Sequence, residues 1–132
     1  MMSEEIEVPK PKREDLLADV FPGVARARVE LNGHIFTFPA PASIKIKAHL
    51  VARRSQSKYP PETGMACLRA AKSLADYLSH AEDHLAEASF AQFVNRPQDV
   101  HRWIAAAHQE FEAAEHYWRN AIADEIRALL KV

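Results

Sequence analysis

The sequence predicts a mainly α-helical domain with one β-hairpin near its N-terminus, an α+β arrangement. The stretch after Pro97 contains no further Gly or Pro and repeats apolar residues at steps of three and four, which is the spacing of one helix face. A similar apolar stripe runs through about residues 62–89. Between two alternating segments stands Asn32-Gly33, a strong signal of a two-residue hairpin turn. Two long helices joined by a short break predict an antiparallel pair.

Length and composition place these elements in a single domain over residues 12–132, preceded by a flexible segment over residues 1–11. Of the 132 residues, 48% are hydrophobic and 27% are charged, which is usual for a globular protein. The run Val8-Pro9-Lys10-Pro11 disfavours helix before it. A short helix is expected over residues 12–21, ended by Pro22-Gly23.

Neither a membrane span nor export is expected. No apolar run approaches about 18 residues, and the acidic N-terminus lacks the apolar centre of a secretory signal. Cys67 is the only cysteine, which fits a reducing compartment. The expected location is the cytoplasm, with no membrane partner.

The turn at Asn32-Gly33 sets the register of the hairpin over about residues 27–38. The facing pairs are Leu31–His34, Val29–Phe36 and Ala27–Phe38, and all six residues share one face. The other face carries Arg28, Glu30, Ile35 and Thr37. Because a lone hairpin is marginal in water, this one is expected to pack on the helices or to join another subunit.

A basic helix is predicted next, over residues 43–57, with Ser43 as its N-cap. Its expected buried edge is Ile44, Ala48, Leu50 and Val51. The run Tyr59-Pro60-Pro61 ends it.

The two long helices are predicted over residues 62–89 and 97–131, and Asn95-Arg96-Pro97 reverses the chain between them. A helix of about 34 residues is roughly 50 Å long. A domain of this size cannot cover such a rod alone, so a partner helix or another subunit is expected to cover part of it.

Charge is distributed unevenly along the chain. The net charge is −1, but residues 1–25 carry −3, residues 26–61 carry +6 and residues 62–132 carry −4. The basic middle is either a solvated helix face or a surface that binds an acidic partner, such as a second copy, another protein or nucleic acid, and the sequence leaves both open. Its candidate contact residues are Lys45, Lys47, Arg53 and Arg54.

Aromatic residues mark the last predicted helix as a second candidate surface. They either pack on the preceding helix or form a contact between subunits, and the sequence leaves both open. The candidate contact residues here are Trp103, Phe111, Trp118 and Ile122.

Histidines at helical spacing raise the question of a metal site. His80 and His84 are four residues apart, as are His108, Glu112 and His116, and such ligands could hold zinc or iron across a helix pair. Di-iron bundles, however, use Glu-x-x-His, whereas Glu112 is followed three residues later by another Glu. Surface contacts at i,i+4 spacing are therefore expected instead, with no metal and no cofactor.

No catalytic constellation is evident, and the chain is not expected to be an enzyme. Cys67 lies in an alanine-rich helical run, and no serine sits in a glycine-flanked elbow. The three glycines, Gly23, Gly33 and Gly64, cannot form a phosphate-cradling loop.

Nucleic acid is the alternative partner. The cations between residues 45 and 58 could contact phosphates, but Tyr59 is the only aromatic residue beside them, so a base-stacking platform is absent. The alternative function is therefore a small helical subunit of a nucleoprotein complex that uses the basic helix.

The hairpin Val29-Glu-Leu-Asn-Gly-His-Ile-Phe-Thr-Phe, its proline exit and the helices that follow resemble the tail assembly chaperones of long-tailed, siphovirus-type phages. The pattern covers residues 27–41, and residues 42–132 match only in general helicity. The resemblance implies a non-enzymatic, phage-encoded protein of the host cytoplasm that oligomerises through helical faces and coats an extended tape-measure protein. It assigns no site residues, because no ligand motif matches.

Overall fold

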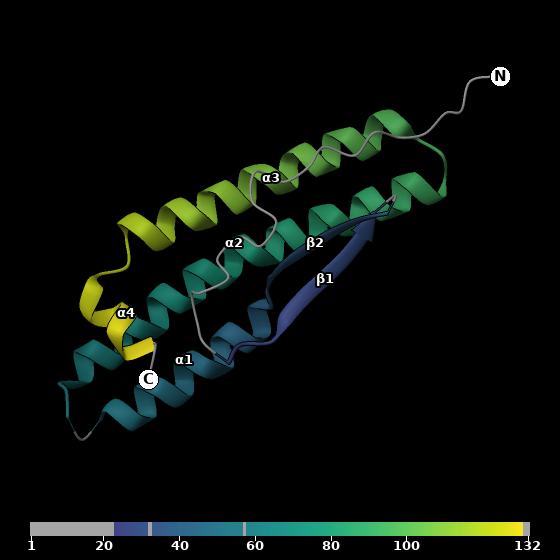
Figure 1. The fold of residues 1–132 in the computed structure, drawn as a ribbon. Coiled ribbons are helices and arrows are strands. Elements are labelled where there is room, and N and C mark those ends of the chain that lie inside the picture. Colours follow the sequence, from purple (N-terminus) through teal and green to yellow (C-terminus); the bar gives the residue numbers. More distant parts are fainter. Residues whose placement is uncertain (1–22, 32, 57, 131–132) are drawn as a thin grey trace.

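The computed structural model describes residues 23–31, 33–56 and 58–130, which form a β-hairpin followed by four helices (Figure 1). The elements are β1 (Arg26–Leu31), β2 (His34–Pro39), α1 (Pro41–Ser55), α2 (Pro61–Phe93), α3 (Pro97–Asn120) and α4 (Asp124–Leu130). The predicted mainly α class with one hairpin is confirmed. The predicted flexible segment over residues 1–11 and helix over residues 12–21 lie outside the described residues.

Helix α2 is the element on which the others pack. Helix α3 runs antiparallel beside it, while α1 lies along its first half and the hairpin along its second half (Figure 1). Its Leu74, Leu78 and Leu85 are fully buried, and the alanines between them are buried too, which lets neighbouring helices approach closely. The core therefore follows α2.

The hairpin has the predicted register, with Leu31 opposite His34 and Phe36 opposite Val29. Its inner face contributes Leu31, Phe36 and Phe38 to the core. The Phe38 ring lies 5.2 Å from that of Phe111 on α3, centroid to centroid. The predicted requirement that the hairpin be covered is met by the helices of the same chain.

Gly33 has a φ of 78°, as a primed hairpin turn requires. Gly33→Val is expected to lower the free energy of unfolding by about 1–2 kcal/mol, because a β-branched residue is strained at positive φ. Gly33→Asn is the matched control, and its free energy of unfolding should decrease less, since Asn tolerates the left-handed region. Urea denaturation of both variants measures the difference, and equal stability of the two would contradict the turn assignment.

Helix α1 begins at Pro41, two residues before the predicted start, and Ser43 is not its N-cap. The N-cap position is Ala40, which makes no side-chain cap, and Pro41 suits the first turn because it has no N–H to satisfy. The Ser43 hydroxyl instead accepts a hydrogen bond from the Ala25 N–H at 3.0 Å. That bond ties the start of α1 to the residue before β1.

The buried edge of α1 is narrower than predicted. Ile44, Ala48 and Val51 are buried, but Leu50 is exposed. Leu50 therefore lies on an outward-facing part of the helix.

The predicted single helix over residues 97–131 is wrong, because the chain turns between Asn120 and Asp124. The Asn120 side chain donates to the His116 carbonyl at 3.0 Å. Arg127 reaches back from α4 and donates to the carbonyls of Trp118, at 2.9 Å, and Arg119. The two Arg127 bonds satisfy carbonyls that the end of α3 leaves without helical partners, and the fold-back buries Leu129 and Leu130 in the core.

Helix α2 continues to Phe93, beyond its predicted end at residue 89. Asn95 then adopts a φ of 59°, which Asn tolerates better than most residues, and the chain reverses where Asn95-Arg96-Pro97 was predicted to do so. None of the described helices is both long and apolar enough to cross a lipid bilayer.

Candidate interaction surface

The structure divides the predicted basic cluster of α1 between two hollows. Lys45 and Arg53 line the outer side of the α1–α2 contact. Arg54 lies with Lys58 at a separate hollow that Leu129 of α4 also lines. Lys47 is half-buried. The four predicted cations therefore do not form one continuous contact face.

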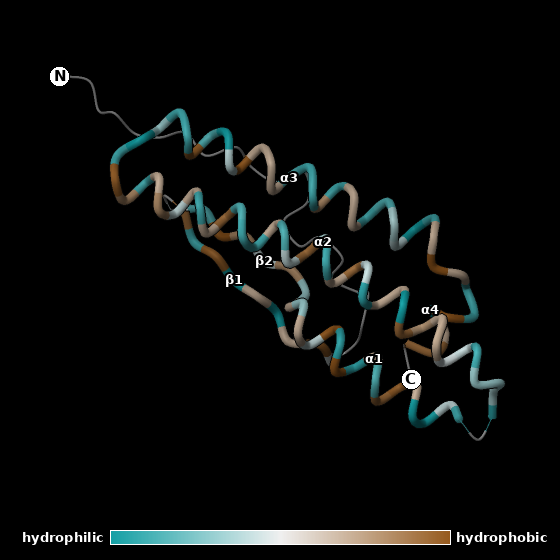
Figure 2. The backbone as a smooth tube through the Cα atoms, turned by 180° about the vertical axis from the view of Figure 1, so that it is seen from behind, coloured by the Kyte–Doolittle hydropathy of each residue, from teal (hydrophilic) through white to brown (hydrophobic). Residues whose placement is uncertain are grey.

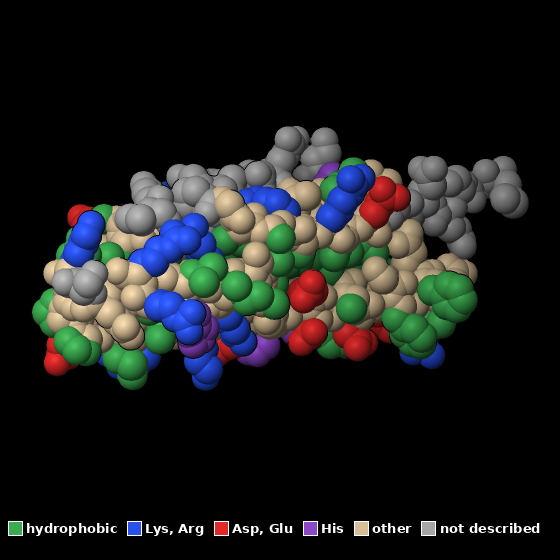
Figure 3. All heavy atoms as spheres, turned by 90° about the horizontal axis from the view of Figure 1, so that it is seen from below, with side chains coloured by type: hydrophobic (Ala, Val, Ile, Leu, Met, Phe, Trp, Pro, Cys, Tyr) green, Lys and Arg blue, Asp and Glu red, His purple; other side chains and the backbone are tan. Residues whose placement is uncertain are grey.

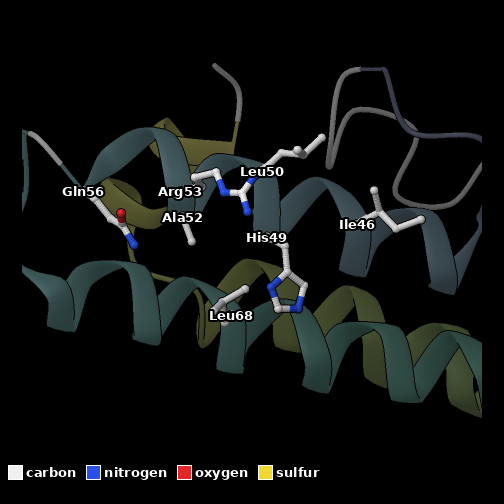
Figure 4. Close-up of a pocket in the computed structure, with 7 residues that line it drawn as sticks. All are labelled: Ile46, His49, Leu50, Ala52, Arg53, Gln56 and Leu68. Carbon is white, nitrogen blue, oxygen red and sulfur yellow. The ribbon is translucent and has the colours of Figure 1, made fainter.

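A shallow groove with an apolar floor runs between α1 and α2, and we refer to it as the α1–α2 groove (Figure 4). His49 points from α1 toward α2, beside Leu68 (Figure 4). The apolar lining residues are Ile46, Leu50, Ala52, Met65 and Leu68. Three of them are exposed although they are large, namely Ile46, Leu50 and Met65.

Small residues bring the two helices together beneath this groove. Gly64 of α2 faces Ala52 of α1, and a Cβ at position 64 would lie 3.6 Å from the Ala52 Cβ. Because neither residue projects a long side chain, the larger apolar residues on both sides form the groove walls.

Cations surround the α1–α2 groove. Lys45 and Arg53 lie on the α1 side, and Arg69 and Lys72 lie on the α2 side. Lys45 Nζ is 4.0 Å from Asp76 Oδ1, and both side chains are about half exposed, so this pair contributes little to stability. Within the described part of the chain, Arg53, Arg69 and Lys72 form no ion pair. The rim is therefore positively charged.

The aromatic candidates of the last predicted helix divide into core and surface residues. Phe111 and Ile122 are each only 2% exposed, so the structure corrects their assignment from contact surface to core. Trp103 is half-buried and stacks on His84 at 5.4 Å between centroids. Trp118 is also half-buried, and the Arg127 guanidinium carbon lies 5.5 Å from its ring centroid. Contacts within the chain thus engage all four residues.

A second apolar surface stands at the end of α2, where the predicted helix had already ended. Phe90 is 61% exposed and Phe93 is 87% exposed, with Val94 beside them; we refer to these three residues as the phenylalanine tip. Figure 2 shows hydrophobic residues where α2 turns into α3. In the sequence, two phenylalanines stand immediately before the chain reversal. Their exposure follows from the continuation of α2 through both of them, beyond its predicted end.

The histidines contact residues on neighbouring elements or on the same helix. His80 Nδ1 lies 3.4 Å from Glu110 Oε2 across the α2–α3 pair, and the His108 ring lies 6.1 Å from that of Phe36, centroid to centroid. His116 is at i,i+4 spacing from Asn120 and contacts its amide at 3.1 Å. Among the described residues, no group of three or more His, Cys, Asp or Glu side chains is placed to hold a metal ion.

The one cysteine is enclosed in the core. Cys67 is fully buried on α2, and desolvation by burial raises the pKa of its thiol from 9.0 to about 11. The thiol is therefore protonated at neutral pH, and the nucleophilic thiolate is disfavoured.

Comparisons with known proteins give no relative for this chain: no protein-family profile, no curated protein and no solved structure matches it. The candidate site therefore rests on the geometry and charge of the α1–α2 groove and the phenylalanine tip.

Proposed function

We propose that this chain is a non-enzymatic assembly protein that associates with itself and binds a protein segment with apolar and acidic side chains in the α1–α2 groove. The observation that supports this proposal is the pairing of an exposed apolar lining with four surrounding cations. Exposed apolar surface of this kind is typical of protein contacts.

The chemistry of the groove defines the partner. Ile46, Leu50 and Met65 offer apolar contact area, while Arg53 and Lys72 offer positive charge. An amphipathic helix with an apolar stripe edged by Asp and Glu would satisfy both, as in other helix-in-groove complexes. The cations would steer such a partner toward the groove and fix its register.

The biological role that we propose for this activity is tail assembly in a long-tailed phage. The hairpin and the helical body are the two parts on which the resemblance to tail assembly chaperones rests. A chaperone of this type would act in the host cytoplasm and cover apolar segments of an extended client until they are assembled. The α1–α2 groove would supply the apolar contact.

Nucleic-acid binding is the second candidate, and the exposed cations Lys45, Arg53, Arg69 and Lys72 are the observation that favours it. Phosphate contacts would make affinity fall steeply with salt concentration. The apolar lining between the cations favours a protein segment instead. Titration with single-stranded DNA at increasing salt distinguishes the two candidates: a steep loss of measurable binding would support the nucleoprotein alternative.

The decisive experiment for the groove uses a synthetic amphipathic helix with Leu on one face and Glu on the other. We expect Ile46→Glu to weaken binding about tenfold or more, because it removes apolar contact and places a negative charge beside an acidic ligand. Ile35→Glu is the matched control, since Ile35 is 42% exposed on the outer face of the hairpin, away from the groove. Calorimetric titration measures both, and equal affinities would contradict the proposed site.

A peptide with Lys in place of Glu provides a second control. We expect it to bind more weakly than the acidic peptide, because the rim is positively charged. Binding of the two peptides with equal affinity would show that the cations around the groove have no role.

A further inference from the structure

We propose that a second copy of this chain packs antiparallel on the exposed face of α2, related by a two-fold axis, so that the phenylalanine tip of each copy covers the α1–α2 groove of the other. This inference rests on the proposed function, because it names the partner of that groove.

One face of α2 carries the residues that would form the contact. They recur at steps of three, four and seven, which places them on a single side of the helix. All of them are exposed except Asp76, which is half-buried and lies near the middle of this row of residues. The row is Met65, Arg69, Lys72, Asp76, Asp83, Glu87, Phe90 and Val94.

The chemistry of this row changes along the helix. Apolar and basic residues come first, at Met65, Arg69 and Lys72; acidic and apolar residues follow, at Asp83 to Phe90. Figure 3 shows a related polarity on one side of the molecule, with most Lys and Arg toward the end where α1 meets α2 and most Asp and Glu toward the other half. A cluster of hydrophobic side chains stands at that far end.

An antiparallel pairing makes the two halves of the row complementary. If the two-fold axis passes between Tyr77 and Leu78, Met65 of one copy faces Phe90 of the other, and Lys72 faces Asp83. Arg69 then faces Glu87 to within one residue. Each contact occurs twice, as an isologous interface requires. Along each α2 helix, the interface extends from Met65 to Phe90, a length of about 37 Å.

Other arrangements lack this match. A parallel pairing in register would place Lys72 against Lys72 and Asp83 against Asp83, which is unfavourable for exposed like charges. Within the described residues, Arg69, Lys72, Asp83 and Glu87 make no ion pair. Their charges are thus available to a second copy.

The phenylalanine tip supplies the apolar part of the contact. Phe90 and Phe93 project from the end of α2 with most of their surface exposed. Antiparallel packing lays Phe90 against Met65 of the other copy, which lines its groove, and Phe93 lies one turn further along, at the same end of the contact. Apolar residues at both ends and charges between them would together fix the register.

The first test is the mass in solution of single charge reversals, measured by light scattering coupled to size exclusion. We expect the wild-type chain to be a dimer. Lys72→Glu places two acids opposite each other, and Asp83→Lys places two lysines opposite each other, so each variant should raise the dissociation constant about tenfold or more. Arg28→Glu, an exposed charge reversal on the outer face of the hairpin, is the matched control and should leave the dimer unchanged.

Mixing the two reversed variants tests the two-fold geometry itself. In a mixed pair, Glu at position 72 of the first variant faces Lys at position 83 of the second, and the unchanged Asp83 faces the unchanged Lys72. The mixture should therefore form a dimer at a concentration at which each variant alone is mostly monomeric. Growth of the mixture into larger species would instead indicate an open head-to-tail contact and would overturn the two-fold pairing.

A third variant separates this inference from the proposed function. Phe90→Asp removes the tip but leaves the α1–α2 groove of the same chain intact, so it should be a monomer that still binds the acidic peptide. A dimer that persists in Phe90→Asp would overturn the inference. A wild-type chain that is monomeric at every concentration would also overturn it, while peptide binding by that monomer would leave the proposed groove standing.

Discussion

Phe111→Ala is expected to lower the free energy of unfolding by about 3–5 kcal/mol, the usual cost of removing a buried phenylalanine ring. Phe111 lies on α3 and is 2% exposed, and its ring centroid is 5.2 Å from that of Phe38 on β2. The substitution therefore leaves a cavity where the hairpin meets the helices. Urea denaturation, monitored by circular dichroism, measures the change.

Phe93→Ala is the matched control, because it is the same truncation at a position that is 87% exposed. We expect its effect on the monomer to stay within about 0.5 kcal/mol, as for most surface substitutions. To exclude any contribution from self-association, both variants are compared at a concentration where the protein is monomeric. A similar decrease in the free energy of unfolding of the two variants would contradict the placement of Phe111 in the core.

Arg127→Ala is expected to lower the free energy of unfolding by about 1–3 kcal/mol, because it removes two side-chain hydrogen bonds to carbonyls, one of them partly buried. Arg127 donates to the carbonyls of Trp118 and Arg119 at the end of α3, and its guanidinium lies over the Trp118 ring. Without these contacts α4 should detach from the end of α3 first. Faster hydrogen exchange of the α4 amides, together with a lower unfolding midpoint, is the expected observation.

Arg102→Ala provides a closely matched control. Arg127 forms an ion pair with Asp124, three residues earlier, and Arg102 does the same with Asp99. Arg102 also lies over a tryptophan ring, that of Trp103. Its side chain is 69% exposed, and within the described residues it donates to no carbonyl at a helix end. We expect Arg102→Ala to lower the free energy of unfolding by less than about 1 kcal/mol, which is typical of an exposed pair. A larger decrease than in Arg127→Ala would show that the Arg127 hydrogen bonds to the carbonyls do not hold α4 against the end of α3.

Local signals predicted the hairpin almost completely. Asn32-Gly33 fixes the loop length, and the alternation on both sides fixes which residues share a face, so the sequence predicted the register and the face that contains Leu31, Phe36 and Phe38. That this face packs on helices of the same chain was visible only in the structure. The chain reversal at Asn95-Arg96-Pro97 was equally readable, because Pro97 disfavours helix at the residue before it.

Helix boundaries that depend on tertiary contacts were not readable in the same way. The stripe of apolar residues continues through Ile122, Ile126 and Leu129, so periodicity alone favours one straight helix after Pro97. The break exists because Arg127 reaches the carbonyls of the preceding helix while Leu129 and Leu130 return to the core. Neither contact has a local signature.

The candidate site was predicted in part. The basic character of α1 was evident, but its cations separate into two hollows, and Arg69 and Lys72 of α2 complete the rim of the α1–α2 groove. Residues from two helices form one surface only after those helices pack, so no single stretch of sequence could reveal it. Exposure of Phe90 and Phe93 was hidden for the same reason.

By itself, the sequence determined the elements whose causes are local: the hairpin and its register, and the reversal before the helix that starts at Pro97. Tertiary structure decided that α2 is the centre of the core, that the last helix breaks at Asn120, and which apolar side chains remain outside. The physical reason is that periodicity reports a preference for burial but not the surface that provides it. Phe111 and Phe90 are both phenylalanines on helices. The packing of α3 on α2, with Phe38 of the hairpin against its ring, buries the first, while the second stays exposed at the end of α2.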